Sequence, residues 1–212
     1  MVLKIHPDNP QARLLQHVVN ELRSGAVIVY PTDTMYALGC DINNKKAVEK
    51  ICAIKGIDPQ KSRLTCVCEN LSILGQYANQ IDTTVFKMMK RAFPGPYVFV
   101  LEASKKIPRH FRHRDTVGIR IAGNNITQRL VEMLGNPIAS ISLPFEENTP
   151  EDILDPERID ANFGKRVELI VDGGYGKLEV STVIDASRGE GDIEVIREGA
   201  GDLAKIGLVL ND

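Results

Sequence analysis

The sequence predicts an α/β protein in which strands and helices alternate along one chain. Short apolar runs, such as 27–30 and 97–101, are separated by segments in which apolar residues recur every three to four positions, such as 10–24. The short runs are typical of buried strands and the longer spacing is typical of amphipathic helices. With 212 residues, of which 43% are hydrophobic, the chain can bury one core as a single domain, 1–212.

The N-terminal elements show how these patterns begin and end. Asn9 and Pro10 predict a helix cap and a first-turn proline, and Gly25 predicts the end of that helix. The β-branched run 27–30 predicts a strand, which Pro31 ends by removing a backbone donor. The same patterns predict helices at 45–54, 71–91 and 126–134, a short helix within 146–160, and strands at 64–69, 97–101, 116–121, 137–142, 167–171, 180–185 and 193–196.

Turn residues separate several of these elements. The helical pattern of 71–91 is interrupted near 80–82, where Asp82 can cap the second piece. The segment 93–96, F-P-G-P, predicts a turn. Gly135 predicts the end of the helix 126–134. We therefore expect strands and helices to be interspersed along the chain, with the strands 167–171, 180–185 and 193–196 following one another near its end.

Composition and charge narrow the class of protein. No stretch approaches the roughly 20 apolar residues that span a bilayer, and the first residues lack the apolar region of a signal peptide. We expect a cytoplasmic protein with no membrane partner. The four cysteines match neither a disulfide framework nor a zinc site, so we expect reduced, buried thiols and no metal centre. They are Cys40, Cys52, Cys66 and Cys68.

The net charge of −2 conceals two oppositely charged stretches. Residues 83–120 contain nine Lys/Arg against two acids, whereas residues 146–160 contain seven acids against one Arg. The acidic stretch is most simply a solvated face, because nothing in the sequence makes its carboxylates converge on a metal. A basic surface and an acidic surface are both predicted.

Three small polar residues, Thr32, Asp33 and Thr34, follow the buried strand 27–30. In α/β proteins the loops at the carboxyl ends of strands are where ligands bind. Clusters of Ser, Thr and Asp also simply form capped turns. Both interpretations remain open from spacing alone.

Cations gather in two further places. Lys55, Lys61 and Arg63 lie beside the strand 64–69, where they are either solvated or in place to meet a phosphate. Arg120 lies inside an apolar strand, where an unpaired cation is costly, so it either reaches a carboxylate of the protein or meets an anionic ligand.

A denser basic stretch runs from 105 to 114, K-K-I-P-R-H-F-R-H-R. It is either a solvated surface segment or a surface for a polyanion such as RNA, which would supply the missing counter-charge. Its permanent cations are Lys105, Lys106, Arg109, Arg112 and Arg114.

Five separated motifs resemble the YrdC/YciO family, the threonylcarbamoyl-AMP synthases. The segment 30–39 reads Y-P-T-D-T-M-Y-A-L-G, where the family has Y-P-T-[DE]-T-x-Y-x-L-G. Segments similar to the family's P-G-P-[LY]-T, G-[VIM]-R-[VI], S-x-S-A-N and G-G…[ST]-T-[VI]-[VI]-D…R-x-G follow in the same order at 94–98, 118–121, 140–144 and 173–199.

The resemblance implies an open twisted mixed sheet with flanking helices and a large concave basic cavity, the YrdC-like (DHBP synthase-like) fold. It also implies a chain without the extra C-terminal domain of longer members. The implied reaction joins ATP, L-threonine and bicarbonate into threonylcarbamoyl-AMP for tRNA modification, with Mg²⁺ accompanying the nucleotide. Lys55 and Ser142 would be catalytic. The implied substrate and nucleotide contacts are Thr32, Thr34, Lys61, Arg63, Arg120, Ser140, Ser181 and Arg197.

Three departures from the synthase pattern concern the implied site. Ile57 replaces the arginine of the family's K-x-R, Pro144 replaces the asparagine of S-x-S-A-N, and Val98 replaces a threonine. This eroded set resembles the YciO branch. We therefore keep three functions open: an enzyme of the synthase type, slow or altered in substrate; a tRNA- or duplex-RNA-binding factor; and a small-ligand-binding protein without catalysis.

Overall fold

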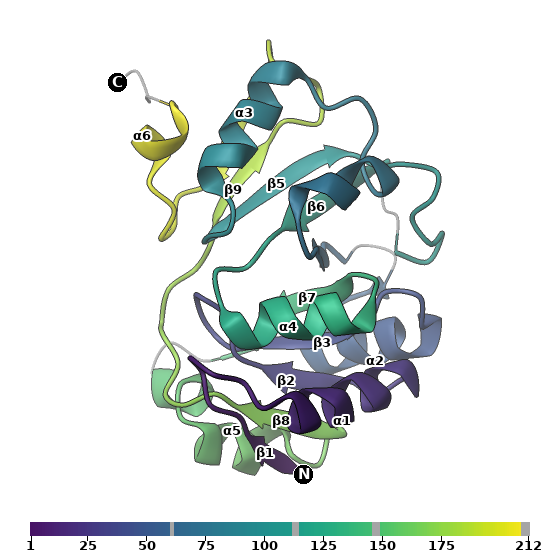
Figure 1. Ribbon diagram of the computed structural model, residues 1–212, viewed down its shortest axis with the longest axis vertical. Helices are drawn as coiled ribbons and strands as arrows, with labels where there is room; N and C mark the ends of the chain where they lie inside the picture. The colour runs from purple at the N-terminus through teal and green to yellow at the C-terminus, as the bar shows by residue number, and fades with distance from the viewer. Residues whose placement is uncertain (60–61, 112–114, 146–148, 209–212) are drawn as a thin grey trace.

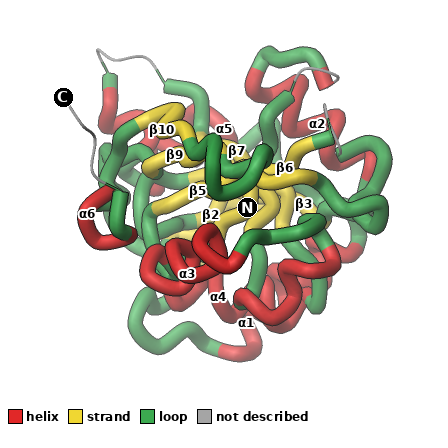
Figure 2. The backbone as a smooth tube through the Cα atoms, turned by 90° about the horizontal axis from the view of Figure 1, so that it is seen from above, coloured by secondary structure: helices red, strands yellow, loops and turns green. Residues whose placement is uncertain are grey.

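The computed structural model describes residues 1–59, 62–111, 115–145 and 149–208. Its helices surround a central group of strands (Figure 2). The helices are α1 (Ala12–Arg23), α2 (Lys45–Lys55), α3 (Thr83–Ala92), α4 (Asn125–Leu134), α5 (Pro156–Phe163) and α6 (Leu203–Ile206), with 3-10 helices η2 (Leu71–Gln76) and η3 (Pro150–Ile153). The strands are β1 (Val2–Lys4), β2 (Ile28–Tyr30), β3 (Ala37–Asp41), β4 (Thr65–Val67), β5 (Tyr97–Glu102), β6 (Thr116–Arg120), β7 (Ile138–Ser142), β8 (Leu169–Asp172), β9 (Thr182–Asp185) and β10 (Glu194–Arg197).

Within the described residues, the strands form one mixed sheet in the order β1-β8-β2-β3-β7-β4-β6-β5-β9-β10. The pairs β1/β8, β2/β8, β4/β6 and β5/β9 are parallel, and the other neighbours are antiparallel. The predicted open mixed α/β sheet with flanking helices is confirmed.

Helices cover both faces of the lower part of the sheet, from β8 to β7 (Figure 1). One apolar cluster joins α1 and α4 to Ile28, Tyr30 and Ala37. A second cluster joins α2 to Val29 and Leu38, which point to the opposite face because strand side chains alternate. The two clusters therefore sandwich this part of the sheet.

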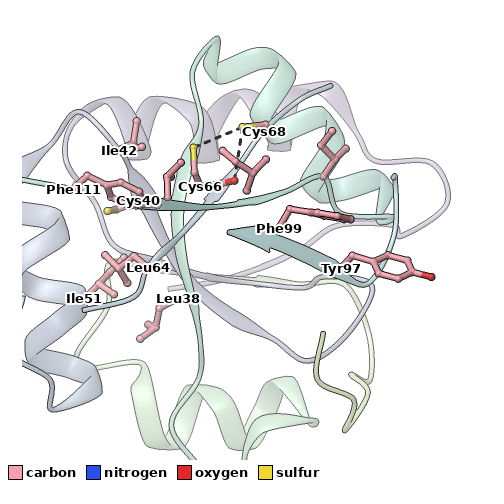
Figure 3. Close-up of a cluster of buried hydrophobic side chains, with 14 of the residues drawn as sticks. Leu38, Cys40, Ile42, Ile51, Leu64, Cys66, Cys68, Tyr97, Phe99 and Phe111 are labelled. Carbon is pink, nitrogen blue, oxygen red and sulfur yellow. Dashed lines mark hydrogen bonds between the residues drawn. The ribbon is translucent and has the colours of Figure 1, made fainter. Parts of the chain in front are cut away.

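The second cluster continues to the upper part of the sheet, where α3 lies beside β5 (Figure 1). Figure 3 shows its side chains, including Phe99, Cys66 of β4 and Cys68, which directly follows that strand. Cys66 and Cys68 are buried free thiols whose sulfur atoms lie 3.7 Å apart. Burial raises the pKa of Cys40 and of Cys66, so both favour the neutral thiol.

Some predicted element boundaries are wrong. The first helix begins at Ala12 behind Gln11, not at Asn9 and Pro10, and Gln11 makes no side-chain cap. Asp82 does precede α3, but its Oδ2 accepts from Glu190 N (2.8 Å) and makes no cap. The predicted interruption of 71–91 near 80–82 is confirmed: the segment forms the 3-10 helix η2 and the α-helix α3, divided near Gln80, whose φ is 22°.

Candidate functional site

A cavity of about 810 Å³ opens on the part of the sheet between β7 and β9. Its polar and charged lining is Thr32, Thr34, Lys55, Ser62, Arg63, Thr65, Thr116, Arg120, Ser140, Ser142, Ser181, Asp185 and Arg197. Its apolar lining includes Val98, Val100, Val180, Val183, Ile196 and Phe111. The predicted concave basic cavity is therefore present.

The register of the strands gives the cavity floor a regular layout. Ser140 pairs with Thr65, Thr65 with Gly118, Gly118 with Val100, and Val100 with Asp185. These residues form one row across β7, β4, β6, β5 and β9. Because alternate residues share a face, the positions two places along each strand also face the cavity.

The row separates two groups of cations. Ser142 lies two residues from Ser140 in one direction, and Arg120 lies two residues from Gly118 in the opposite direction. Ser142 and Arg120 are thus about 13 Å apart along the strand direction. We call the group of Lys55, Arg63 and Ser142 the Lys55 end, and the group of Thr34, Arg120, Ser181 and Arg197 the Arg120 end.

At the Lys55 end, the last residue of α2 is aimed at the sheet. Lys55 Nζ donates to the carbonyl oxygen of Ser142 (2.8 Å). Burial lowers the pKa of Lys55, because a charged ammonium loses hydration there. Arg63 is exposed but also lines the cavity. Two cations at one end provide a site for a polyanion such as a phosphate chain.

At the Arg120 end, three segments converge on one buried guanidinium. Arg120 Nη2 donates to Asp33 Oδ1 (2.6 Å) and Thr34 Oγ1 (2.9 Å), and Nη1 donates to Ser181 Oγ (2.7 Å). Asp33 and Arg120 have side chains only 12% and 11% exposed. Of the two partners considered for Arg120 in the sequence, a carboxylate of the protein is therefore present, and it is Asp33.

The loop from Thr32 to Met35 is itself a hydrogen-bonded turn. Thr32 Oγ1 accepts from Thr34 N (3.0 Å) and donates to Met35 O (2.8 Å). Both threonines also line the cavity. The two interpretations of this segment are therefore compatible: the turn is capped, and the cap presents Thr34 to Arg120.

Ser140 has less freedom to bind a ligand than its position implies. Its Oγ accepts from the Tyr30 hydroxyl (2.6 Å) and donates to Leu38 O (3.2 Å). Burial raises the pKa of Tyr30 to about 12, so this phenol stays protonated and donates. Ser140 therefore ties β2, β3 and β7 together at the cavity wall.

Arg197 reaches the cavity from β10. Its Nε donates to Ser181 O (3.0 Å), and the residue lines the cavity. Burial lowers the pKa of Arg197, and the neighbouring Arg120 lowers it further. The two guanidinium groups repel each other, and an anion bound beside them would relieve that repulsion.

Nine of the ten predicted catalytic and substrate-contact residues line the one cavity. Lys61 lies outside the described residues. Of the positions that depart from the synthase pattern, Val98 lines the cavity, whereas Ile57 and Pro144 do not, and Ile57 packs against the main core. Sequence reasoning did not single out Asp33 or Asp185 as site residues, although both fall within the quoted motifs.

The basic stretch is only partly described. Lys105, Lys106 and Arg109 are exposed in the turns after β5, whereas Ile107 and Phe111 are buried and anchor the segment. Arg112 and Arg114 lie outside the described residues. The described cations of this stretch do not line the cavity and form a separate surface.

Across 1–59, 62–111, 115–145 and 149–208, no three His, Cys, Asp or Glu side chains come together as metal ligands. Over the same residues, the structure contains no helix with the length and hydrophobicity needed to cross a bilayer.

Comparisons with known proteins identify the family of this chain. The Sua5/YciO/YrdC family model, described as "Telomere recombination", matches residues 20–199. The chain is 44% identical over 203 residues to the uncharacterized protein YciO of Escherichia coli K12, covering 94% of this chain and 95% of that protein. The crystal structure of E. coli YciO matches with a TM-score of 0.88 at 41% identity, covering 97% and 98% of the two chains.

Enzymes are among the other relatives. Threonylcarbamoyl-AMP synthase of Halorhodospira halophila is 30% identical over 176 residues, 82% of this chain and 90% of that enzyme. P. abyssi Sua5, solved in complex with L-threonine, matches with a TM-score of 0.85 at 26% identity, covering 97% of this chain and 59% of that one. The protein therefore belongs to the Sua5/YciO/YrdC family, which includes the threonylcarbamoyl-AMP synthases.

Proposed function

We propose that this protein is an ATP-binding enzyme of the threonylcarbamoyl-AMP synthase type, a nucleotidyltransferase that joins L-threonine, bicarbonate and ATP and releases pyrophosphate. The observation that carries the proposal is that hydroxyl and cationic side chains from separate motifs border one cavity. The relatives named threonylcarbamoyl-AMP synthase support the choice of substrates. A role in tRNA modification would place the protein in the cytoplasm.

The two cationic ends suit this chemistry. A carbamate oxygen must attack the α-phosphate of ATP, so the site has to align two anions and neutralise their charge. We assign the triphosphate, with its accompanying Mg²⁺, to the Lys55 end. The amino acid carboxylate belongs at the Arg120 end. The reacting groups then meet over the row that contains Thr65 and Gly118.

The eroded set makes the enzyme slow or altered in substrate. Removing one preorganised donor to a developing charge costs about 2.7–4 kcal/mol of barrier. Neither Ile57 nor Pro144 supplies such a donor, and neither lines the cavity. Arg63 does line it, and we assign the missing cation to Arg63.

A three-substrate assay tests the proposal. Pyrophosphate release should require ATP, L-threonine and bicarbonate together, and Lys55→Ala should abolish it. Lys46→Ala is the matched control, since Lys46 is an exposed lysine on the same helix. If ATP or L-threonine binds but no pyrophosphate forms under any condition, the protein is the non-catalytic ligand-binding alternative.

RNA binding is a second candidate function, favoured by the exposed cations of the stretch after β5. Lys105, Lys106 and Arg109 are held outward by the buried anchors Ile107 and Phe111. Duplex RNA or tRNA would bind through its phosphates, so affinity should fall steeply with salt. Neutralising Lys105 and Arg109 should make the salt slope shallower by about two. An unchanged slope in a filter-binding titration would exclude this surface.

A further inference from the structure

Asp33 is the carboxylate that meets Arg120 at the Arg120 end of the cavity. It lies in the loop between β2 and β3, between two threonines that line the cavity. Its Oδ1 accepts from Arg120 Nη2 at 2.6 Å. Its Oδ2 is buried and has no hydrogen-bond partner among the described residues. The loop thus brings a buried, partly unsatisfied negative charge to the edge of an anion site.

The contacts of Arg120 leave it little to offer a ligand. Each terminal nitrogen of a guanidinium carries two N–H donors. Both donors of Nη2 go to Asp33 and Thr34, and one donor of Nη1 goes to Ser181. Arg120 is therefore a held, already neutralised cation with one donor left on Nη1, and its Nε–H is buried and has no partner among the described residues.

The two ends of the cavity differ in net charge. Arg120 and Asp33 cancel, so Arg197 is the uncompensated cation of the Arg120 end. At the Lys55 end, Lys55 and Arg63 both line the cavity, and no ion pair of the described residues neutralises either. One end thus carries about one net positive charge and the other about two. A carboxylate carries one negative charge, whereas a phosphate carries up to two at neutral pH.

We propose that Asp33 is a specificity-determining residue, which lowers the positive charge of the Arg120 end so that this end takes a carboxylate and rejects phosphate. It acts through Arg120 and does not touch the substrate. The proposal rests on the proposed function in that it assigns the amino acid to this end. Its physical basis is that each site prefers the anion whose charge it balances, and like-charge repulsion by Asp33 excludes the dianion.

Competition binding tests the role of Asp33 without requiring turnover. The dissociation constant of L-threonine is measured by calorimetry, with and without inorganic phosphate, for the wild type and Asp33→Asn. Asparagine keeps an oxygen that can accept from Arg120, so the geometry is retained while the charge is lost. In the wild type, phosphate should change the constant by less than about twofold. In Asp33→Asn, phosphate should weaken L-threonine binding roughly tenfold, the effect expected for one unit charge acting over several ångströms.

Asp185→Asn is the matched control. Asp185 is a carboxylate that lines the cavity itself, but it lies in the middle row, four residues after Ser181, a separation of about 13 Å in an extended chain. Its neutralisation changes the total charge equally and should not make phosphate compete with L-threonine. If both variants behave alike, total charge and not the position of Asp33 decides selectivity, and the proposal is wrong.

Two further variants test the proposal if Asp33→Asn is unstable. If Asp33→Asn does not fold, Asp33→Glu should retain the wild-type selectivity and Arg197→Gln should weaken L-threonine binding about tenfold. Failure of either result, or no L-threonine binding by the wild type, overturns the proposal. If instead phosphate competes only in Asp33→Asn but no protein releases pyrophosphate, the specificity stands and the proposed enzymatic function fails.

Discussion

Identical side chains in the cavity differ in what they leave available to a ligand. Arg120 uses three of its donors within the protein, whereas Arg197 makes one hydrogen bond, through Nε. Ser140 has its hydroxyl occupied on both sides, whereas Lys55 binds Ser142 through the carbonyl and not the hydroxyl. At the residue scale, then, Arg197 and Ser142 are better placed to meet substrate than Arg120 and Ser140.

The lowered pKa of Lys55 predicts a pH dependence of polyanion binding. The charged ammonium binds phosphates, so affinity should fall as pH rises through a pKa that lies below 10.5. Stability should change in the opposite direction. The unfolded chain holds this proton more tightly, so the cost of burying the ammonium is present below the folded pKa and disappears as pH rises towards 10.5.

Calorimetric titration of pyrophosphate between about pH 7 and 10 measures this effect. Lys55→Arg is the control, because arginine stays charged across that range. Its affinity should remain level where that of the wild type declines. Equal declines in the two proteins would show that another group causes the change.

Arg63 is predicted to carry the charge that Ile57 lacks. Arg63→Ala should lower kcat for pyrophosphate release by about two to three decades, the usual effect of removing one such contact. Arg13→Ala, an exposed arginine of α1 outside the cavity, should leave kcat unchanged. Wild-type turnover in Arg63→Ala would mean that Arg63 does not replace the missing cation.

At the element scale, the sequence patterns predicted most elements but not their exact form. The predicted strand 116–121 and helix 126–134 correspond closely to β6 and α4. β3 was not predicted, because its A-L-G-C-D sequence has no β-branched residue and contains a glycine. β1 was missed because it is three residues long and mostly exposed. Both strands are stabilised by pairing with distant strands, which no local pattern records.

The segment between β8 and β9 runs along one side of the molecule and joins its lower and upper parts (Figure 1). It is fastened by Tyr36, whose hydroxyl accepts from Gly173 N (3.0 Å) and donates to Gly174 O (2.7 Å). The aromatic ring also packs against Gly176, where a Cβ would lie 2.9 Å from it. These contacts of Tyr36 lie a few residues before Val180 and Ser181 in the chain, and both of those residues line the cavity.

Tyr36→Phe should therefore destabilise the protein by about 1–3 kcal/mol, because it leaves the Gly173 N–H without its partner. Urea unfolding measures the change in free energy. Tyr175→Phe is the matched control, since Tyr175 belongs to the same segment but is 66% exposed, and it should change stability by less than about 0.5 kcal/mol. Equal effects of the two substitutions would show that the Tyr36 hydroxyl does not fasten the segment.

At the scale of the whole molecule, the cavity exists because α1 and α4 cover only part of one sheet face. The motifs predicted which residues would gather there, but not how they contact one another. Asp33 and Arg120 are 87 positions apart in the sequence, so their ion pair depends on the strand order β3-β7-β4-β6. The sequence left open whether Arg120 met a protein carboxylate or a ligand, because that choice depends on tertiary contacts.

The middle of the cavity floor is kept open by Gly118, and this predicts how ligands stabilise the fold. A Cβ there would lie 3.7 Å from Thr65 Oγ1, an ordinary contact, and 3.3 Å from Val98 Cγ1, a tight contact that requires the Val98 side chain to shift by a few tenths of an ångström. The larger side chain of Gly118→Val would extend from the middle row into the space between the two cationic ends. Valine suits a strand, so we expect the variant to fold.

For the wild type, ATP or L-threonine at about 100 times its dissociation constant should add about 2.7 kcal/mol of stability. In a domain of this size that raises the Tm by roughly 5–10 °C, which a thermal-shift assay measures. Gly118→Val should keep its unliganded Tm within a few degrees but lose most of this shift. Gly75→Ala is the control, because no atom lies within 4 Å of a Cβ at that position, which is outside the cavity. A full shift in Gly118→Val would mean that the ligands bind elsewhere, since two substrates that meet over Gly118 cannot share that space with a valine side chain.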